Sequence, residues 1–233
     1  IENGRKTIEK VKQRMSYCNG TLKKLIFVLI LAYGAVNFSQ AGVLGGRNID
    51  DQLIKFDVFL GSKKVGFHTF YFEKVGKELH VKSEANMSFR VFLFKNIKYL
   101  HEANEVWQDN CLLKFSSKTI KGDSELSVEG KNFGDKFIVS NLSGENQFSG
   151  CIRSFAYWAP ELLEAEELLN VENGVLVPVK VDKQPNHNES GYSATINLPK
   201  SKIDLKYQDD DNWIELETNL KLLGKLRYKK VVT

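Results

Sequence analysis

One segment of the chain alternates apolar and polar residues over a length that only an extended strand accommodates. It runs from Leu79 to Phe94, and the apolar residues on one side of the alternation are Leu79, Val81, Ala85, Met87, Phe89, Val91 and Leu93. A helix would distribute these residues around its whole surface, whereas a β-strand places them on one face. At about 3.3 Å per residue the strand would be about 50 Å long, so we expect it to curve or to contain a β-bulge.

The same period of two extends over most of the chain beyond Phe56. The segment 56–72 predicts a hairpin, with Phe56, Val58 and Leu60 on one face and a turn at residues 61–64. Further strands are expected at residues 97–107, 112–120, 125–128, 136–139, 148–152, 175–181, 192–198, 202–207, 213–220 and 225–232. Their regular spacing and polar turns predict an antiparallel meander.

Residues 160–169 interrupt this alternation with a helical pattern. Pro160 suits the first turn of a helix, and Glu161 and Glu164 suit its positive end. One apolar stripe is formed by Leu162, Ala165, Leu168 and Leu169. The pattern predicts a mainly β fold in which one large curved antiparallel sheet, a half-barrel, wraps around this short amphipathic helix.

The N-terminal part of the chain has the order of an export signal. Lys23 and Lys24 precede an apolar run over residues 25–36, and Ser39-Gln40-Ala41 follows with small residues at both recognition positions. We therefore expect a signal peptide over residues 15–41 and cleavage after Ala41. The alternative is a retained membrane anchor, but a run of about 12 residues is shorter than the roughly 20 that a spanning helix needs.

The position of this signal divides the chain. Residues 1–14 are interpreted as sequence upstream of the true start at Met15, and residues 42–233 as one mature domain of about 190 residues. No cysteine follows the apolar run closely enough to carry a lipoprotein acyl chain. We therefore expect an exported protein that has no membrane span after cleavage, periplasmic if its source is a Gram-negative bacterium.

The charge of the mature domain argues against nucleic acid as a partner. The whole chain has 33 Lys and Arg and 29 Asp and Glu; residues 1–41 contain seven and two of these, which leaves 26 basic and 27 acidic residues. The two signs are interspersed along most segments. A nucleic-acid-binding protein is expected to show a basic patch or stripe instead.

Two cysteines, Cys111 and Cys151, follow the predicted cleavage site. In an oxidising compartment they can pair and close a loop of about 40 residues, which would contribute about 3 to 4 kcal/mol. The alternative is two separate buried thiols.

Neither metal nor catalytic residues form a recognisable motif. His101 and Glu105, in the string HEANE, would lie about 13 Å apart on a strand, too far to share one metal. Asp209-Asp210-Asp211-Asn212 lies between two alternating segments, where a hairpin turn is the simpler interpretation than a calcium site. No cofactor is indicated. A hydrolase assembled around His68 and His101 stays open as an alternative, because distant strands can bring catalytic groups together.

Large aromatic residues are the remaining candidates for a ligand site. Trp107, Tyr157, Trp158 and Trp213, with His68, can line a cavity on the inner face of a curved sheet, or they can form an ordinary core.

Several segments carry a resemblance to a known family. They are FDVFLGSKKVGFHTFYF, NEVWQDNCLLKFSSKT, AYWAPELL followed by LLNVENG, and DLKYQDDDNWIELE. With these segments the chain resembles an uncharacterised family of exported bacterial envelope proteins. The matching positions are Gly61, Gly66, His68, Glu105, Trp107, Trp158, Pro160, Tyr207 and Trp213.

In outline that family is similar to the periplasmic lipoprotein carriers, whose half-barrels hold acyl chains on their concave face. The resemblance implies a non-catalytic envelope protein that binds an apolar, lipid-like ligand or another envelope component. A purely structural or interaction protein, with a filled core and an exposed sheet edge, is a further alternative.

Overall fold

The computed structural model describes residues 53–91, 95–185, 190–221 and 223–231, which form fifteen β-strands and one 3₁₀ helix. The predicted extension 1–14 and signal peptide 15–41 lie outside the described residues, as do residues 42–52 at the start of the predicted mature domain. In the described part of the chain, no helix has the length and hydrophobicity needed to cross a bilayer.

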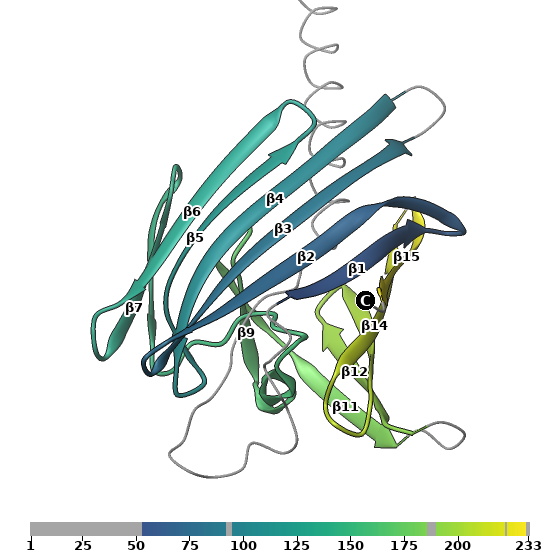
Figure 1. Cartoon of the computed structure of the whole chain (residues 1–233). Helices are drawn as coiled ribbons and strands as arrows, with labels where there is room; N and C mark the ends of the chain where they lie inside the picture. The colour runs from purple at the N-terminus through teal and green to yellow at the C-terminus, as the bar shows by residue number, and fades with distance from the viewer. Residues whose placement is uncertain (1–52, 92–94, 186–189, 222, 232–233) are drawn as a thin grey trace, which may run out of the picture.

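Thirteen of these strands form one antiparallel sheet, which confirms the predicted mainly β class. Its first half consists of β1 (Leu53–Leu60), β2 (Lys63–Val75), β3 (Glu78–Val91), β4 (Lys95–Gln108), β5 (Cys111–Lys121), β6 (Ser124–Asn132), β7 (Lys136–Asn141) and β8 (Gly144–Ser149). Its second half consists of β11 (Lys180–Pro185), β12 (Tyr192–Leu198), β13 (Ser201–Tyr207), β14 (Trp213–Leu220) and β15 (Gly224–Lys230). The first and last strands, β1 and β15, pair with each other, so the two halves join there (Figure 1).

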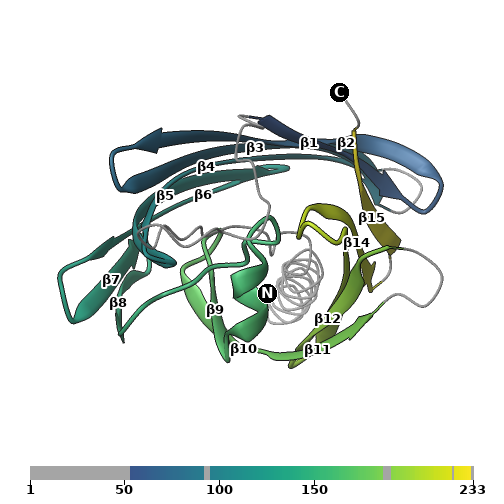
Figure 2. The same cartoon turned by 60° about the horizontal axis from the view of Figure 1, so that its bottom comes forward.

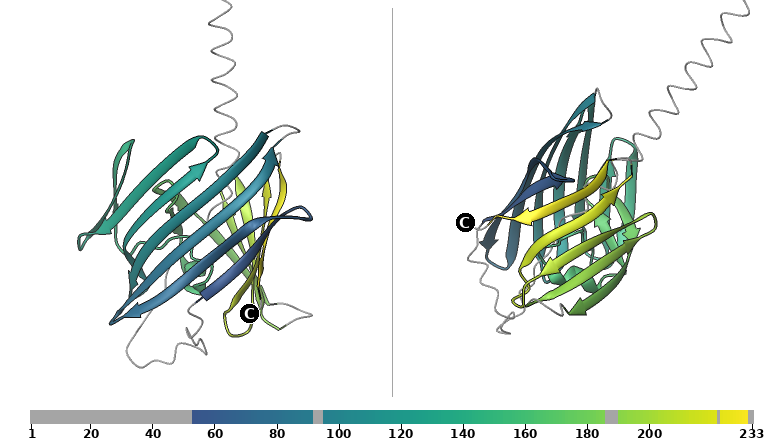
Figure 3. Two further views of the ribbon diagram at one scale, coloured as in Figure 1. Left: turned by 45° about the horizontal axis from the view of Figure 1, so that its top comes forward. Right: turned by 90° about the vertical axis from the view of Figure 1, so that its right-hand side faces the viewer.

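The sheet is curved, and its two halves form two walls that meet along β1 and β15 (Figure 3). The edges of the sheet are β8 and β11. The segment 150–179 connects these two edges and lies on the inner side of the curve (Figure 2). It contains the 3₁₀ helix Pro160–Glu164 and a two-stranded sheet of β9 (Glu167–Asn170) and β10 (Val175–Pro178).

The prediction of an amphipathic α-helix over residues 160–169 is wrong. The helix is 3₁₀ and ends at Glu164, Ala165 is extended, and Leu168 and Leu169 belong to β9. A ten-residue helix is marginal on its own, so tertiary contacts decide the conformation. Here, consecutive residues from Leu168 to Glu172 are buried, which an extended segment inside the curve permits on both of its faces.

The long alternating segment forms β3 as predicted, and its inward residues Leu79, Val81, Ala85, Met87 and Phe89 are all buried. The pairing of β3 with β2 and β4 continues without a register shift. Register shifts occur instead between β1 and β2, between β4 and β5, and between β13 and β14. Of the two alternatives expected for this strand, a curve or a β-bulge, its described pairing shows no bulge.

Tight turns account for the close spacing of the strands. Between β4 and β5 the chain reverses through Asp109 and Asn110, which have φ angles of 50° and 66°. Two central residues with positive φ form the turn whose twist suits a two-residue hairpin. Gly66 meets a different constraint, because a Cβ there would lie 2.0 Å from the backbone oxygen of Asn86 on β3.

Candidate functional site

The five predicted ligand-site residues are brought together in the core of the molecule. Trp107, Tyr157, Trp158, Trp213 and His68 are each at most 3% exposed. They come from three strands, β2, β4 and β14, and from segment 150–179. The structure therefore places them inside the curved sheet, where they contact other core side chains.

Trp213 lies at the centre of these contacts. Its ring centroid is 4.0 Å from that of Phe56 and 5.4 Å from that of Tyr157. The hydroxyl of Tyr207 donates to the backbone oxygen of Tyr157 at 2.7 Å, which ties segment 150–179 to β13. Trp158 packs against Phe72 at 4.9 Å between ring centroids. These contacts hold the segment against the inner face.

A row of three polar side chains and one alanine crosses the middle of the inner face. We call it the inner row; it consists of His68, Ala85, His101 and Thr119, on the neighbouring strands β2 to β5. All four side chains are buried, and Nδ1 of His101 lies 2.7 Å from the hydroxyl oxygen of Thr119. Ala85, which has no polar side chain, separates the two imidazoles in the row.

Burial determines the charge of the two imidazoles. It lowers the pKa of His101 to about 3. It also lowers the pKa of His68 well below the ordinary value, with a smaller contribution from His101. Both rings are therefore neutral at pH 7, and each has one nitrogen that donates and one that accepts. The inner row can hydrogen-bond to a polar group without carrying charge.

Glu105 is a further buried polar residue on the inner face. One carboxylate oxygen accepts a 2.9 Å hydrogen bond from the indole N–H of Trp107. The other, Oε1, is buried and has no hydrogen-bond partner among the described residues. Burial raises the pKa of Glu105 to about 8, although the bond from Trp107 opposes this shift. The group is therefore mostly protonated at pH 7.

A buried ion pair lies beyond Thr119 on β5. Nζ of Lys121 is 3.7 Å from a carboxylate oxygen of Glu172, in segment 150–179. Burial raises the pKa of Glu172 to about 7, and the positive charge of Lys121 opposes that rise. The hydroxyl of Ser117 donates to the backbone oxygen of Val171 at 2.6 Å and fixes this part of the segment to the sheet.

Several groups that a hydrolase could use are present among the described residues. Cys111 and Cys151 are joined by a disulfide with a Cα–Cα distance of 5.1 Å, so neither is a free nucleophile in this form. One histidine–carboxylate pair is His80–Glu78, at 2.9 Å on partly exposed side chains. The described residues contain no group of three or more metal-ligating side chains. The segment Asp209–Asn212 forms the turn between β13 and β14.

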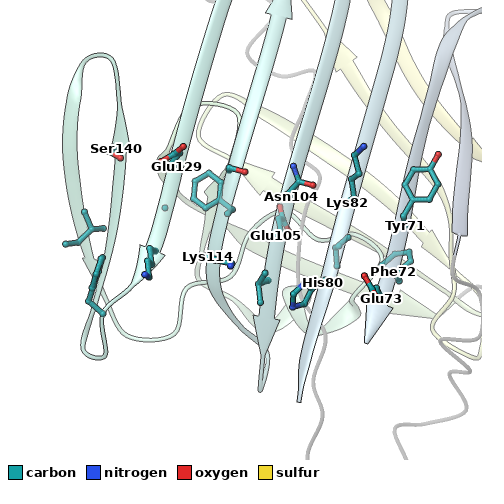
Figure 4. Close-up of a pocket in the computed structure, with 18 of the residues that line it drawn as sticks. Tyr71, Phe72, Glu73, His80, Lys82, Asn104, Glu105, Lys114, Glu129 and Ser140 are labelled. Atoms are coloured by element: carbon teal, nitrogen blue, oxygen red, sulfur yellow. The ribbon is translucent and has the colours of Figure 1, made fainter. Parts of the chain in front are cut away.

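A hollow of about 990 Å³ lies over the outer face of the first half of the sheet (Figure 4). Its floor follows one line of directly opposed residues on seven consecutive strands. We call it the outer row; from β2 to β8 it consists of Tyr71, Lys82, Asn104, Ser116, Glu129, Ser140 and Glu145. Five of these are labelled in Figure 4, where they lie side by side across the strands.

A second hollow, of about 490 Å³, adjoins the first on the same face. The two share Asn104, Ser116 and Glu129. All seven residues of the outer row are exposed. The molecule thus has an aromatic and weakly polar inner face and a polar, hollowed outer face.

Sequence reasoning did not identify Thr119, Lys121, Glu172 or the outer row as site residues. Alternation placed Glu105 and His101 on the same face as Trp107, and this was the available signal for a polar group inside. The register between strands decides which residues are opposed, and alternation within one strand does not determine it.

The comparisons with known proteins concern family and fold. A family model described as a domain of unknown function (DUF6134) matches residues 56–231. A solved structure described as a "Beta-barrel-like Protein of Domain of Unknown Function DUF1849 from Brucella abortus" is similar, with a TM-score of 0.56 and 13% identity, over 77% of this chain and 94% of that one. At this identity the likeness concerns the fold alone. No curated protein matches the chain.

Proposed function

The chain belongs to the DUF6134 family of domains of unknown function, and we propose that it binds an apolar, lipid-like ligand, without catalysis, on the concave face of a half-barrel. We further propose that it is exported, and periplasmic if its source is Gram-negative. The observation that carries the binding proposal is the inner row, in which three hydrogen-bonding side chains are buried across the inner face between two apolar zones.

The inner face has two apolar zones on either side of this row. Segment 150–179 packs on the zone that contains Phe72, Leu112 and Trp213. A second zone of buried side chains lies on the other side of the inner row, toward the opposite ends of the strands. We call it the distal zone; it consists of Val58, Val65, Met87, Phe89, Ile97 and Leu226. We propose that the hydrocarbon part of the ligand lies along this zone.

The inner row fits the polar end of such a ligand. Burying polar groups costs stability unless they form hydrogen bonds, so a purely structural core favours apolar residues at these positions. The neutral imidazoles and the Thr119 hydroxyl can hydrogen-bond to a hydroxyl, ester or protonated acid. A charged phosphate would find no compensating positive charge in the row itself.

An interaction protein is the second candidate function, and the packed aromatic core favours it. Trp107, Tyr157, Trp158 and Trp213 fill the space in which the sequence predicted a ligand. In that case the partner is another envelope component, which would pair with an edge strand. β8 and β11 are both edges, and nearly all of their residues are exposed.

Substitution in the distal zone tests the lipid proposal. The full chain is titrated with a fluorescent fatty acid, and Met87→Gln is compared with Met87→Leu. We expect saturable binding that weakens at least tenfold in Met87→Gln, because an amide replaces part of the apolar surface, and that persists in Met87→Leu. Leu142→Gln, at a side chain that is 90% exposed, is the surface control and leaves binding unchanged.

Circular dichroism and thermal unfolding establish that each variant is folded. The absence of saturable binding to the parent chain, or equal binding by the folded Met87→Gln and Met87→Leu variants, would contradict the proposal. An interaction protein would give the first of these results.

A further inference from the structure

The outer row offers hydrogen-bonding groups at regular intervals along a line. Neighbouring strands are about 4.8 Å apart, so seven strands present a line of about 29 Å across the sheet. Its middle consists of an amide, a hydroxyl and a carboxylate, on Asn104, Ser116 and Glu129. None of these three side chains forms a hydrogen bond or ion pair with another described residue, whereas Lys82 pairs with Glu84 at 2.7 Å. The middle of the row is therefore available to a ligand.

Exposed aromatic rings flank this line. Tyr71 stands at the β2 end of the row and is 43% exposed. Phe133, which follows β6 and lines the same hollow, is 59% exposed, and Nζ of Lys131 lies 5.4 Å from the centre of its ring. Exposed rings of this size on a hollowed polar surface indicate a contact site, since they offer flat apolar faces for stacking.

The charges around the hollow balance. Its exposed lining includes three lysines, Lys82, Lys114 and Lys131, and three glutamates, Glu73, Glu129 and Glu145. A fourth lining glutamate, Glu105, is buried, and its raised pKa keeps it mostly protonated at pH 7. A polyanion such as nucleic acid or a charged membrane surface requires an excess of positive charge, which this surface lacks. The balance favours a polar ligand without net charge.

We propose that the outer row binds a linear, uncharged oligosaccharide that lies across the strands. Sugar rings combine an apolar face, which stacks on an aromatic ring, with hydroxyls at their edges that donate and accept hydrogen bonds. One ring of an extended chain spans about one strand spacing, so successive rings meet successive side chains of the row. This site lies on the opposite face of the sheet from the inner row and does not depend on ligand binding there.

Titration calorimetry of the full chain with three linear neutral hexasaccharides tests the proposal: a β-1,4-glucan, a β-1,4-linked N-acetylglucosamine chain and an α-1,4-glucan. We expect at least one to bind, with an affinity that changes less than twofold between 50 and 500 mM NaCl. Tyr71→Ala and Asn104→Ala should each weaken this binding at least tenfold. Leu142→Ala, at an exposed apolar position outside both hollows, should leave it unchanged.

The proposal is overturned if no hexasaccharide binds, if binding persists in the folded Tyr71→Ala and Asn104→Ala variants, or if it weakens steeply with salt. Both side chains are exposed, so these variants are expected to fold, and thermal unfolding checks this. Fatty-acid binding is measured on the same variants. Fatty-acid binding tests the inner face alone, so the lipid proposal and the oligosaccharide proposal can each fail without the other.

Discussion

Glu105 is the residue whose chemistry is least suited to its surroundings. It is 2% exposed, and the sequence surrounds it with Ala103 and Trp107 on the same face of β4. Its single described hydrogen bond comes from Trp107. A buried carboxyl of this kind is kept neutral by its raised pKa, and the free energy of unfolding falls as the pH rises from the ordinary carboxyl pKa to the raised one.

Glu105→Gln should raise the free energy of unfolding at neutral and alkaline pH. In the folded protein the pKa of Glu105 is raised from 4.5 to about 8, so between these values the unfolded chain binds fewer protons and stability falls as pH rises. The glutamine keeps an acceptor for the Trp107 N–H but cannot ionise. At pH 7 we expect the variant to be more stable by about 3 kcal/mol.

Urea unfolding of parent and variant at pH 4 and pH 7 measures this difference. At pH 4 the carboxyl is neutral in both states, so the two proteins should agree to within about 1 kcal/mol. An equal difference at both pH values would show that the effect is one of packing and not of ionisation. Glu102→Gln, on the outer face of the same strand, is the matched control and should show no such dependence on pH.

At the scale of elements, most strands were predictable and the segment between β8 and β11 was not. β8 begins four residues before the strand expected at residues 148–152, and the strand expected at residues 175–181 is divided between β10 and β11. Strands such as β3 and β14 have one inward and one outward face, and their sequences alternate accordingly. Segment 150–179 is enclosed by the sheet, so its burial follows no single period. Leu162, Leu168 and Leu169 match a helical stripe, whereas β9 is a strand because it pairs with β10 and bridges to Ser154, and a helical period does not reveal these pairings.

The disulfide between Cys111 and Cys151 fastens this segment to the sheet. It joins the start of β5 to the beginning of the segment across 40 residues. Closing a loop of this size should contribute about 3 to 4 kcal/mol by restricting the unfolded chain. We therefore expect Cys111→Ser with Cys151→Ser to lower the free energy of unfolding by that amount.

Thermal unfolding with and without reductant checks this expectation. The parent chain should lose stability when reduced, whereas the double variant should be insensitive to reductant. Thiol titration shows when both cysteines of the parent chain are reduced. If the midpoint of thermal unfolding is then unchanged, the disulfide does not contribute to stability.

At the scale of the whole molecule, the inward position of Trp107, Trp213 and His68 was predictable, because alternation shows which side of each strand faces inward. Tyr157 and Trp158 lie in segment 150–179, whose burial follows no single period, and ligand binding by these five residues stays a prediction. The inner row depends on the register of four neighbouring strands, and the outer row on that of seven. A shift of the register by one position would bring different residues opposite His101 and Asn104. The sequence of a single strand does not determine this register.

The curved sheet has two faces of different chemistry, and we propose a different ligand for each. On the inner face, the neutral inner row borders the apolar distal zone. A natural ligand held there would accompany the protein through purification, whichever fatty acid serves as a probe.

Native mass spectrometry of the protein purified from its own host without detergent, followed by organic extraction, is the most direct measurement. We expect a bound molecule in about one-to-one proportion to the protein, which organic extraction identifies as lipid-like with an uncharged polar end. A mass that corresponds to the chain alone, from a folded protein that also takes up no added fatty acid or phospholipid, would contradict the lipid proposal.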